Sequence, residues 1–406
     1  MRARRPIVRS GADRLLEHPE WLAGRRYALL GHAASVATGA DGALLPLHLA
    51  LAALGSAAPR ALFAPEHGYW GIEQDMVASA DARDPWTGVP VRSLYGDRRE
   101  TLLPRADSFE GIDLLLLDLQ DVGSRYYTYA ATAIWAAEAA LGQGIEVWVL
   151  DRPNPLGGCR VEGNLPSAGL ESFVSAFKTP VCHGLTLGEL VRLEAQRRGW
   201  DDAGLRVVKL EGWRRDMRWA ETGLAWIAPS PNMPTAETAE VYPGACLVEA
   251  TTLSEGRGTT RPFQLIGAPG LDPRALLAAL GQTAVPGVDL LPAYFRPQFQ
   301  KHAGARCGGL AVVVRDARVF APYRLGVTLL AAVRAVAPEV FAWRQEPYEF
   351  VADIPAIDLL TGGTACRTAI DAGGDAAEWV ATWAADEAAF RIERDAFLLY
   401  RAGAGE

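Results

Sequence analysis

Residues 111–129, GIDLLLLDLQDVGSRYYTY, are the stretch of sequence that decides the fold. The run 112–117 is apolar except for Asp113, which is the pattern of a strand buried on both faces of a parallel sheet. Polar side chains crowd into the residues that follow, namely Asp118, Gln120, Asp121, Ser124, Arg125, Tyr126 and Tyr127. A helical pattern at 130–141 comes next. Because open α/β sheets bind ligands at the carboxyl ends of their strands, this stretch predicts a ligand-binding edge.

The same pattern recurs in the first half of the chain. Apolar runs at 27–30, 61–64 and 145–150 are each followed by a polar loop. These loops are Gly31-His32, Pro65-Glu66-His67-Gly68 and Asp151-Arg152-Pro153-Asn154-Pro155. Ordinary capping and turn chemistry explains any single loop of this kind. Together, the four loops predict a cleft along one edge of a sheet.

The order of the remaining elements predicts the architecture. Helices are expected at 11–22, 44–54, 187–198, 273–280, 323–336 and 381–394, and further strands at 25–30, 205–210, 224–228, 245–252 and 310–314. A strand, an apolar helix and a strand in succession indicate a right-handed parallel crossover. The composition changes near Pro243. We therefore predict an α/β protein with a Rossmann-like, doubly wound, mainly parallel sheet in residues 1–242. A smaller α/β domain is expected in residues 243–406, with a cleft between the two.

Composition excludes several classes of protein. The net charge of −8 argues against a nucleic-acid partner, which usually requires a basic face. Five scattered cysteines without a CxxC pair indicate neither a disulfide framework nor a structural zinc site. No run approaches 18 apolar residues, and the N-terminal segment has basic residues without an apolar core. We therefore expect no membrane span, no membrane partner and no export signal, and hence a cytoplasmic protein.

The familiar cofactor and nucleophile motifs are missing from the sequence. The segment 256–261, GRGTTR, comes close to a glycine-rich dinucleotide loop, but Arg261 replaces the third glycine and no acidic residue follows about 20 positions later. The sequence contains no phosphate loop ending in GKS or GKT, no HExxH and no GxSxG. We therefore expect no cofactor and no bound metal.

The remaining chemistry is that of carboxylates beside histidine, arginine, tyrosine and asparagine. The carboxylates at predicted strand ends and in polar loops are Glu66, Asp118, Asp121, Asp151, Glu162 and Glu255. Such a set can protonate a glycosidic oxygen and stabilise or activate a group on the other face of the sugar. Two alternatives stay open: a small-ligand binding protein without turnover, and a metal-dependent hydrolase that uses His67 and Asp121.

At these same residues the sequence resembles the NamZ-like exo-β-N-acetylmuramidases. The matching stretches include APEHGYWG (64–71), LLLLDLQDVGSRYYTY (114–129), VLDRPNPLGG (149–158), VEG (161–163), HGLTLGEL (183–190), PSPNMPT (229–235), VYPG (241–244) and LSEGRGTTRPFQLIGAPG (253–270). The resemblance covers nearly the whole chain. It implies a Rossmann-like domain joined to a smaller α/β domain, with the cleft between them. It also implies release of terminal N-acetylmuramic acid (MurNAc) from the non-reducing end of peptidoglycan fragments such as MurNAc-GlcNAc, without a nucleotide cofactor.

Roles can be assigned to some residues on this basis. Glu66 is the expected general acid, because the flanking Tyr69 and Trp70 could desolvate its carboxyl and raise its pKa. The second role could fall to Glu162, Asp121 or Glu255, or to the 2-acetamido group of the substrate. Arg125 or Arg257 is expected to hold the lactyl carboxylate of MurNAc, since a guanidinium binds a carboxylate bidentately. The other expected substrate-binding residues are His67, Tyr126, Tyr127, Asp151, Asn154, His183 and Asn232.

Overall fold

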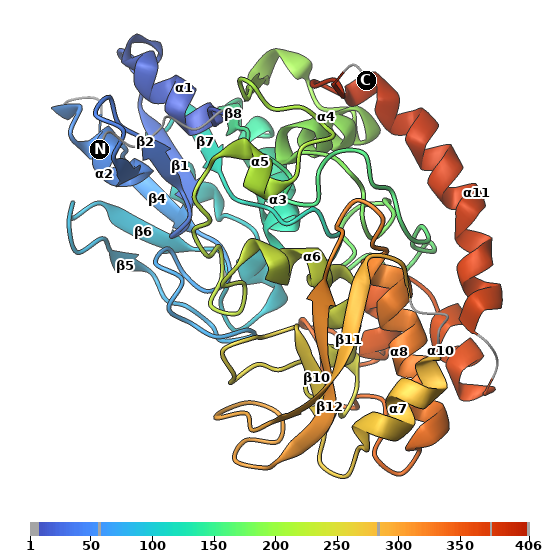
Figure 1. Ribbon diagram of the computed structural model, residues 1–406. Helices are drawn as coiled ribbons and strands as arrows, with labels where there is room; N and C mark the ends of the chain where they lie inside the picture. Colours follow the sequence, from blue (N-terminus) through green and yellow to red (C-terminus); the bar gives the residue numbers. More distant parts are fainter. Residues whose placement is uncertain (1–7, 56–57, 282–284, 374–375, 404–406) are drawn as a thin grey trace.

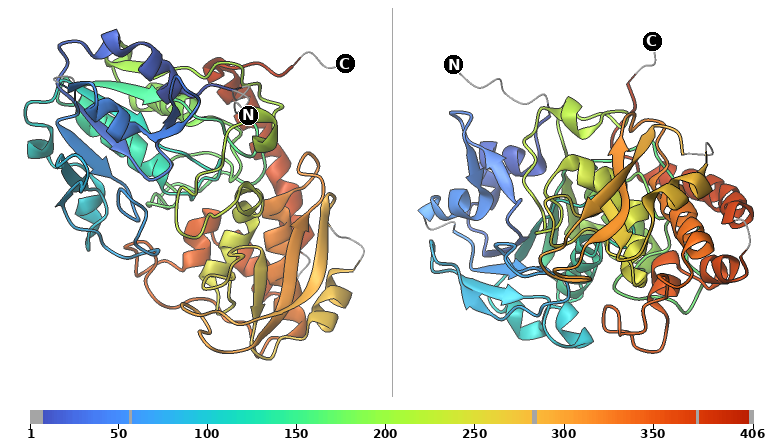
Figure 2. Two further views of the ribbon diagram at one scale, coloured as in Figure 1. Left: turned by 60° about the vertical axis from the view of Figure 1, so that its left-hand side comes forward. Right: turned by 60° about the horizontal axis from the view of Figure 1, so that its bottom comes forward.

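The structure is a computed structural model that describes residues 8–403 apart from 56–57, 282–284 and 374–375. The chain folds into two lobes, each built around its own sheet (Figure 1). The views of Figure 2 show the larger sheet in the first half of the chain and the smaller one, drawn in orange, in the second half. The α/β class and the two-part architecture predicted from the sequence are confirmed.

The larger sheet is wound in two directions from β1. Its strands, in spatial order, are β5 (Ala82–Arg83), β6 (Pro90–Ser93), β4 (Ala61–Ala64), β1 (Tyr27–Gly31), β7 (Leu114–Asp118), β8 (Glu146–Leu150) and β9 (Leu205–Val208). All neighbouring strands are parallel except β5 and β6. The chain adds β4 and β6 on one side of β1 and then β7, β8 and β9 on the other. The order therefore reverses between β1 and β7, the position at which doubly wound sheets bind ligands.

Both faces of this sheet are buried, which explains the unbroken apolar runs in its strands. Leu114 and Leu116 of β7 belong to a core that includes residues of α1 (Gly11–Glu17) and α2 (Leu47–Ala52). Leu115 and Leu117, on the opposite face, join the core that includes α3 (Tyr129–Leu141) and α4 (Leu187–Arg198). Because successive strand residues point to opposite faces, a strand covered on both sides must be apolar throughout.

The second lobe is an antiparallel sheet covered by helices. Its strands, in spatial order, are β10 (Leu265–Ala268), β12 (Cys307–Val314) and β11 (Val288–Phe295). The helices of this part are α6 (Ala236–Ala245), α7 (Pro273–Leu280), α8 (Pro322–Val336), α9 (Ala356–Thr361), α10 (Ala365–Asp371) and α11 (Ala376–Arg394). The long α11 runs along the outside of the molecule from the second lobe back to the first (Figure 1). Among the described residues, none of the helices has the length and apolar character needed to cross a bilayer.

Short elements complete the chain. A hairpin is formed by β2 (Val36–Thr38) and β3 (Leu44–Pro46), and α5 (Trp219–Thr222) is a single turn. The 3₁₀ helices among the described residues include η1 (Pro19–Leu22), η3 (Arg99–Leu102), η4 (Ala106–Phe109), η5 (Asp202–Gly204), η6 (Cys246–Ala250) and η7 (Asp395–Phe397). The expected domain boundary after residue 242 falls inside α6.

Several predicted elements are wrong. The helix expected at 44–54 begins only at Leu47, because 44–46 pairs with β2. The helix expected at 11–22 stops at Glu17, just before Pro19 begins η1. No strand forms at 224–228, and the segment 245–252 is the end of α6 followed by η6. In that last segment tertiary packing overrides the β-propensity of its valine, leucine and threonines.

Candidate active site

The loops that leave β1 and β7 are tied together at the switch point of the sheet. The backbone N–H of Gln120, just after β7, donates a hydrogen bond to Nε2 of His32 at 2.8 Å. Arg152, which follows β8, binds both carboxylate oxygens of Asp118 at 2.7 and 2.8 Å. Burial raises the pKa of Asp118, and the guanidinium of Arg152 opposes that rise. These hydrogen bonds and this ion pair therefore hold the loops after β1, β7 and β8 in fixed positions beside the site.

A pocket lies where these loops meet the second lobe. Its lining residues come from the loop after β4, the residues before α3 and its first residue, the segment around Val174, the loop before α6, and the second lobe. They are Glu66, His67, Asp75, Tyr126, Tyr127, Thr128, Tyr129, Val174, Ser230, Asn232, Met233, Tyr242, Glu249, Arg257, Phe263, Tyr348 and Glu349. Six of the predicted site residues line this pocket: Glu66, His67, Tyr126, Tyr127, Asn232 and Arg257.

Glu66 is held in place by two elements of the first lobe. Its Oε1 accepts a hydrogen bond from the backbone N–H of Met76 at 3.1 Å, and its Oε2 lies 2.9 Å from the hydroxyl of Thr128, just before α3. The neighbouring His67 has a φ of 72°, a left-handed conformation that turns the chain sharply after β4. The carboxyl of Glu66 is therefore buried in the wall of the pocket in one orientation.

Arg257 gathers three carboxylates on the second-lobe side of the pocket. Its guanidinium nitrogens lie 3.1 Å from Asp75, 2.6 Å from Glu249 and 3.3 Å from Glu255. Lys301 also binds Glu255, at 3.0 Å. Glu255 therefore approaches the site as predicted, but both of its oxygens are paired with cations. Asp75 belongs to the loop after β4, so this ion cluster also connects the two lobes.

The prediction missed three carboxyl groups that line the pocket: Asp75, Glu249 and Glu349. Asp75 and Glu349 lie in loops without any periodic pattern, and Glu249 lies in a segment misread as a strand. Glu349 accepts a hydrogen bond from the hydroxyl of Tyr95 at 3.0 Å. Burial raises the pKa of Glu349 well above its usual range, and the nearby charge of Glu66 raises it further. Nothing in the local sequence signals this residue, because only the fold brings it to the pocket.

Asp121 and His183 form a buried pair that does not line the pocket. Nε2 of His183 lies 3.9 Å from Oδ2 of Asp121, which accepts a hydrogen bond from the backbone of Gly123 at 2.7 Å. Burial raises the pKa of Asp121 to about 7. Burial, together with nearby arginines, lowers the pKa of His183 to about 3. Asp121 was expected to face the cleft, and its absence from the residues that line the pocket corrects that prediction.

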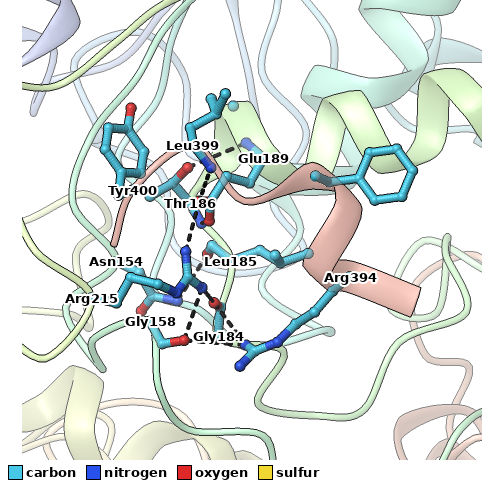
Figure 3. Close-up of polar contacts among 12 residues, drawn as sticks. Asn154, Gly158, Gly184, Leu185, Thr186, Glu189, Arg215, Arg394, Leu399 and Tyr400 are labelled. Atoms are coloured by element: carbon cyan, nitrogen blue, oxygen red, sulfur yellow. Dashed lines mark hydrogen bonds and ion pairs between the residues drawn. The ribbon is translucent and has the colours of Figure 1, made fainter. Parts of the chain in front are cut away.

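Asp151 and Asn154 are structural residues, contrary to expectation. Asp151 accepts hydrogen bonds from the hydroxyls of Thr186 and Tyr400, at 2.7 and 2.6 Å, and from backbone N–H groups. Asn154 donates to the carbonyl of Leu185 at 2.9 Å. Figure 3 shows this region, where the chain after α11 returns to the first lobe. There the backbone of Leu399 donates to Glu189, and the arginines Arg215 and Arg394 bind backbone carbonyls.

Arg125 and Glu162 also have structural roles, because their side chains are hydrogen-bonded to the backbone of other segments. The guanidinium of Arg125 is fully buried and donates to the carbonyls of Asn164, Thr179 and Leu360 at 2.7 to 2.9 Å. Glu162 accepts a hydrogen bond from the first turn of α8, and burial raises its pKa to about 7. The expectation that Arg125 faces the pocket is therefore wrong, since Arg125 is not among the lining residues and its guanidinium donates to three backbone carbonyls instead.

Comparison with known proteins agrees with this architecture. The model of the N-terminal part of exo-β-N-acetylmuramidase NamZ matches residues 28–237, and the model of its C-terminal part matches residues 240–400. The peptidoglycan β-N-acetylmuramidase NamZ of Bacillus subtilis is 37% identical over 98% of this chain and 92% of its own length. A crystal structure of a DUF1343 family protein from Bacteroides fragilis superposes with a TM-score of 0.87 at 30% identity, covering 98% of this chain and all of the other. A second such protein from the same organism gives a TM-score of 0.72 at 26% identity, covering 98% and 99%. The chain belongs to the NamZ family of exo-β-N-acetylmuramidases.

Proposed function

We propose that this protein is an exo-β-N-acetylmuramidase that releases terminal MurNAc from the non-reducing end of peptidoglycan fragments such as MurNAc-GlcNAc. The observation that carries the proposal is the buried carboxyl of Glu66 in a pocket between two lobes, in a chain that belongs to the NamZ family.

The lining of the pocket fits an amino sugar. Tyr127, Tyr242 and Phe263 form an edge-to-face series of rings that can pack against the apolar side of a sugar. Asn232 and His67 offer hydrogen-bonding groups for hydroxyl and acetamido groups. Of the two arginines expected to bind the lactyl carboxylate, only Arg257 lines the pocket. We propose that it binds this group, with the substrate competing against Asp75, the most exposed of its three partners.

Glu66 is the proposed catalytic carboxyl of the first lobe. Of the expected candidates for a second carboxyl, Asp121 and Glu162 lie outside the pocket lining, and Glu255 is neutralised by Arg257 and Lys301. The second group must therefore be another carboxyl of the pocket or the 2-acetamido group of the substrate.

A single assay separates this proposal from the two alternatives. The purified protein is expected to release free MurNAc from MurNAc-GlcNAc and to cleave a chromogenic MurNAc glycoside, at a rate unchanged by a strong chelator. A binding protein would retain the sugar without turnover, and loss of activity with chelator would identify a metal-dependent hydrolase. Among the described residues, no group of three His, Cys, Asp or Glu side chains is placed to hold a metal ion.

We further propose that the protein works in the cytoplasm, on fragments that the cell has taken up. All five cysteines are free thiols, and four of them are buried, which is usual in a reducing compartment. Cell fractionation is expected to recover the protein and its activity with the cytoplasmic contents. Recovery from outside the cytoplasmic membrane would contradict this assignment.

A further inference from the structure

Glu349 lies on a turn whose backbone conformation is unfavourable for the residues it contains. Tyr348 and Val351 exchange two backbone hydrogen bonds, of 2.9 and 3.0 Å, so that Glu349 and Phe350 are the two central residues of a tight hairpin turn. Both have a positive φ, 46° and 66° respectively. Turns of this type strongly prefer Asn-Gly or Asp-Gly, because left-handed backbone is costly for larger side chains. Such conformations persist where the surroundings enforce them, and they cluster at functional sites.

Contacts with both lobes hold this turn in place. The hydroxyl of Tyr348 donates to Glu249 of the second lobe at 2.8 Å. On the other side, Phe350 packs edge-on against Tyr95 of the first lobe, with ring centroids 5.4 Å apart. The hydroxyl of Tyr95 donates to Oε2 of Glu349 at 3.0 Å. The carboxyl of Glu349 is therefore buried, fixed through one oxygen and placed in the lining of the pocket that contains Glu66.

The charges around Glu349 favour its protonated form. Burial raises its pKa, and the negative charges of Glu66, Glu249 and Asp75 act in the same direction. The hydrogen bond from Tyr95 opposes the rise without cancelling it. Arg257, which also lines the pocket, already pairs with Asp75 and Glu249. Two carboxyl groups that line one pocket are the arrangement that glycosidases use for acid and base work.

We propose that Glu349 is the proton donor of the reaction and that Glu66 is its ionised partner. This inference rests on the proposed function and replaces the expectation that Glu66 is the acid. The proton of Glu349 passes to the glycosidic oxygen as the bond from C1 to that oxygen breaks, and the electron pair stays on the leaving oxygen. Water then supplies a hydroxyl to C1 and a proton to the Glu349 carboxylate. Glu66 compensates the positive charge that develops at C1, and Tyr95 is a positioning residue for Glu349.

If Glu349 had a purely structural role, its replacement should lower the melting temperature, whereas a catalytic role predicts no such loss of stability. A glutamate that lies in left-handed backbone and is buried among other acidic groups destabilises the folded protein. Its replacement by asparagine, which tolerates left-handed backbone, should therefore leave the melting temperature equal or higher. A catalytic role predicts that activity is lost while stability is kept, the usual trade-off at active sites.

The test compares two substrates with leaving groups of different quality. Glu349→Gln is expected to lower kcat on MurNAc-GlcNAc at least 100-fold, with little change in KM, because the sugar leaving group needs a proton. On a nitrophenyl MurNAc glycoside, whose leaving group needs no proton, turnover should stay within about fivefold of wild type. The alkaline limb of the wild-type pH profile, which reports loss of the acid's proton, should disappear in the variant.

Further variants separate catalysis from folding. Glu349→Asp and Glu349→Asn have side chains of the same size, so higher activity in the aspartate variant would show that the carboxyl itself is needed. Glu346→Gln, an exposed change in the same loop, is the matched control and should act like wild type.

Tyr95→Phe should move the alkaline limb of the pH profile to higher pH, since the hydrogen bond that this variant loses favours the charged form of Glu349.

The outcomes are distinct for the two proposals. A wild-type protein without turnover on either substrate would refute the proposed function itself. An active wild type together with near-native turnover of Glu349→Gln on MurNAc-GlcNAc would overturn the assignment of Glu349. Equal losses on both substrates would also overturn it, because a proton donor must act selectively on the poorer leaving group.

Discussion

Replacement of Glu66 by glutamine is expected to lower kcat about 100-fold or more on both MurNAc-GlcNAc and a nitrophenyl MurNAc glycoside, with little change in KM. An ionised carboxylate stabilises positive charge at C1 whatever the leaving group is, so the loss should not depend on leaving-group quality. Glutamine keeps the shape of the side chain, and its amide oxygen can still accept the hydrogen bond from Met76. The protein should therefore fold normally, and the fall in rate should reflect chemistry alone.

The leaving-group comparison also tests the division of roles between the two glutamates. A loss confined to MurNAc-GlcNAc would make Glu66 the acid, as the sequence suggested, and would remove that role from Glu349. Turnover within about threefold of wild type on both substrates would remove Glu66 from the chemistry altogether. Glu100→Gln, an exposed change in η3 between β6 and β7, is the matched control and should leave kcat unchanged.

The largest expected effect on stability comes from Gly244→Ala. Gly244 on α6 lies against Pro322 and Gly326 on α8, and a Cβ at this position would lie far closer to the Pro322 carbonyl oxygen than van der Waals contact allows. The obstructing atoms belong to backbone, so a side-chain rotation cannot relieve the overlap, and the helices must separate. We expect the free energy of unfolding to fall by about 3 kcal/mol or more, measured as a shift of the urea midpoint.

The control for this change lies on the same helix. Glu237→Ala replaces an exposed residue of α6 and should change stability by about 0.5 kcal/mol or less. In an uncrowded helix, alanine is about 1 kcal/mol better than glycine, so helix propensity alone predicts stabilisation by Gly244→Ala. A rise in the urea midpoint would therefore show that the two helices do not approach each other closely at this glycine.

The parallel sheet was predictable because its signal is local. In residues 112–117 each strand residue is buried on one face or the other, so burial on both faces leaves an unbroken apolar run in the sequence. The turn residues and polar loops at the carboxyl ends of the strands were also predictable, because they follow each apolar run directly in the sequence. Glu66 could be named as a site residue from its position after β4 alone, and it does line the pocket.

The sequence failed where packing decides between competing local preferences. Residues 245–252 have strand-like composition, yet residues 245–250 are helical because Ala245 ends α6, which packs on α8, and η6 continues from it. Polar character alone also could not distinguish a substrate-binding side chain from a structural one. Arg125 and Asp151 follow strands as Glu66 does. However, Arg125 donates to the backbone carbonyls of distant segments, and Asp151 accepts from the hydroxyls of Thr186 and Tyr400.

The sequence by itself determined the α/β class, the two-part architecture, the family and six of the residues that line the pocket. Only the tertiary structure placed Glu349, which is separated from Glu66 by more than half of the chain, in the same pocket. The reason is physical: its position depends on a strained turn held by Tyr95 and Glu249, in two different lobes. Contacts of this kind leave no periodic or local pattern, because each partner contributes a single residue from a distant segment.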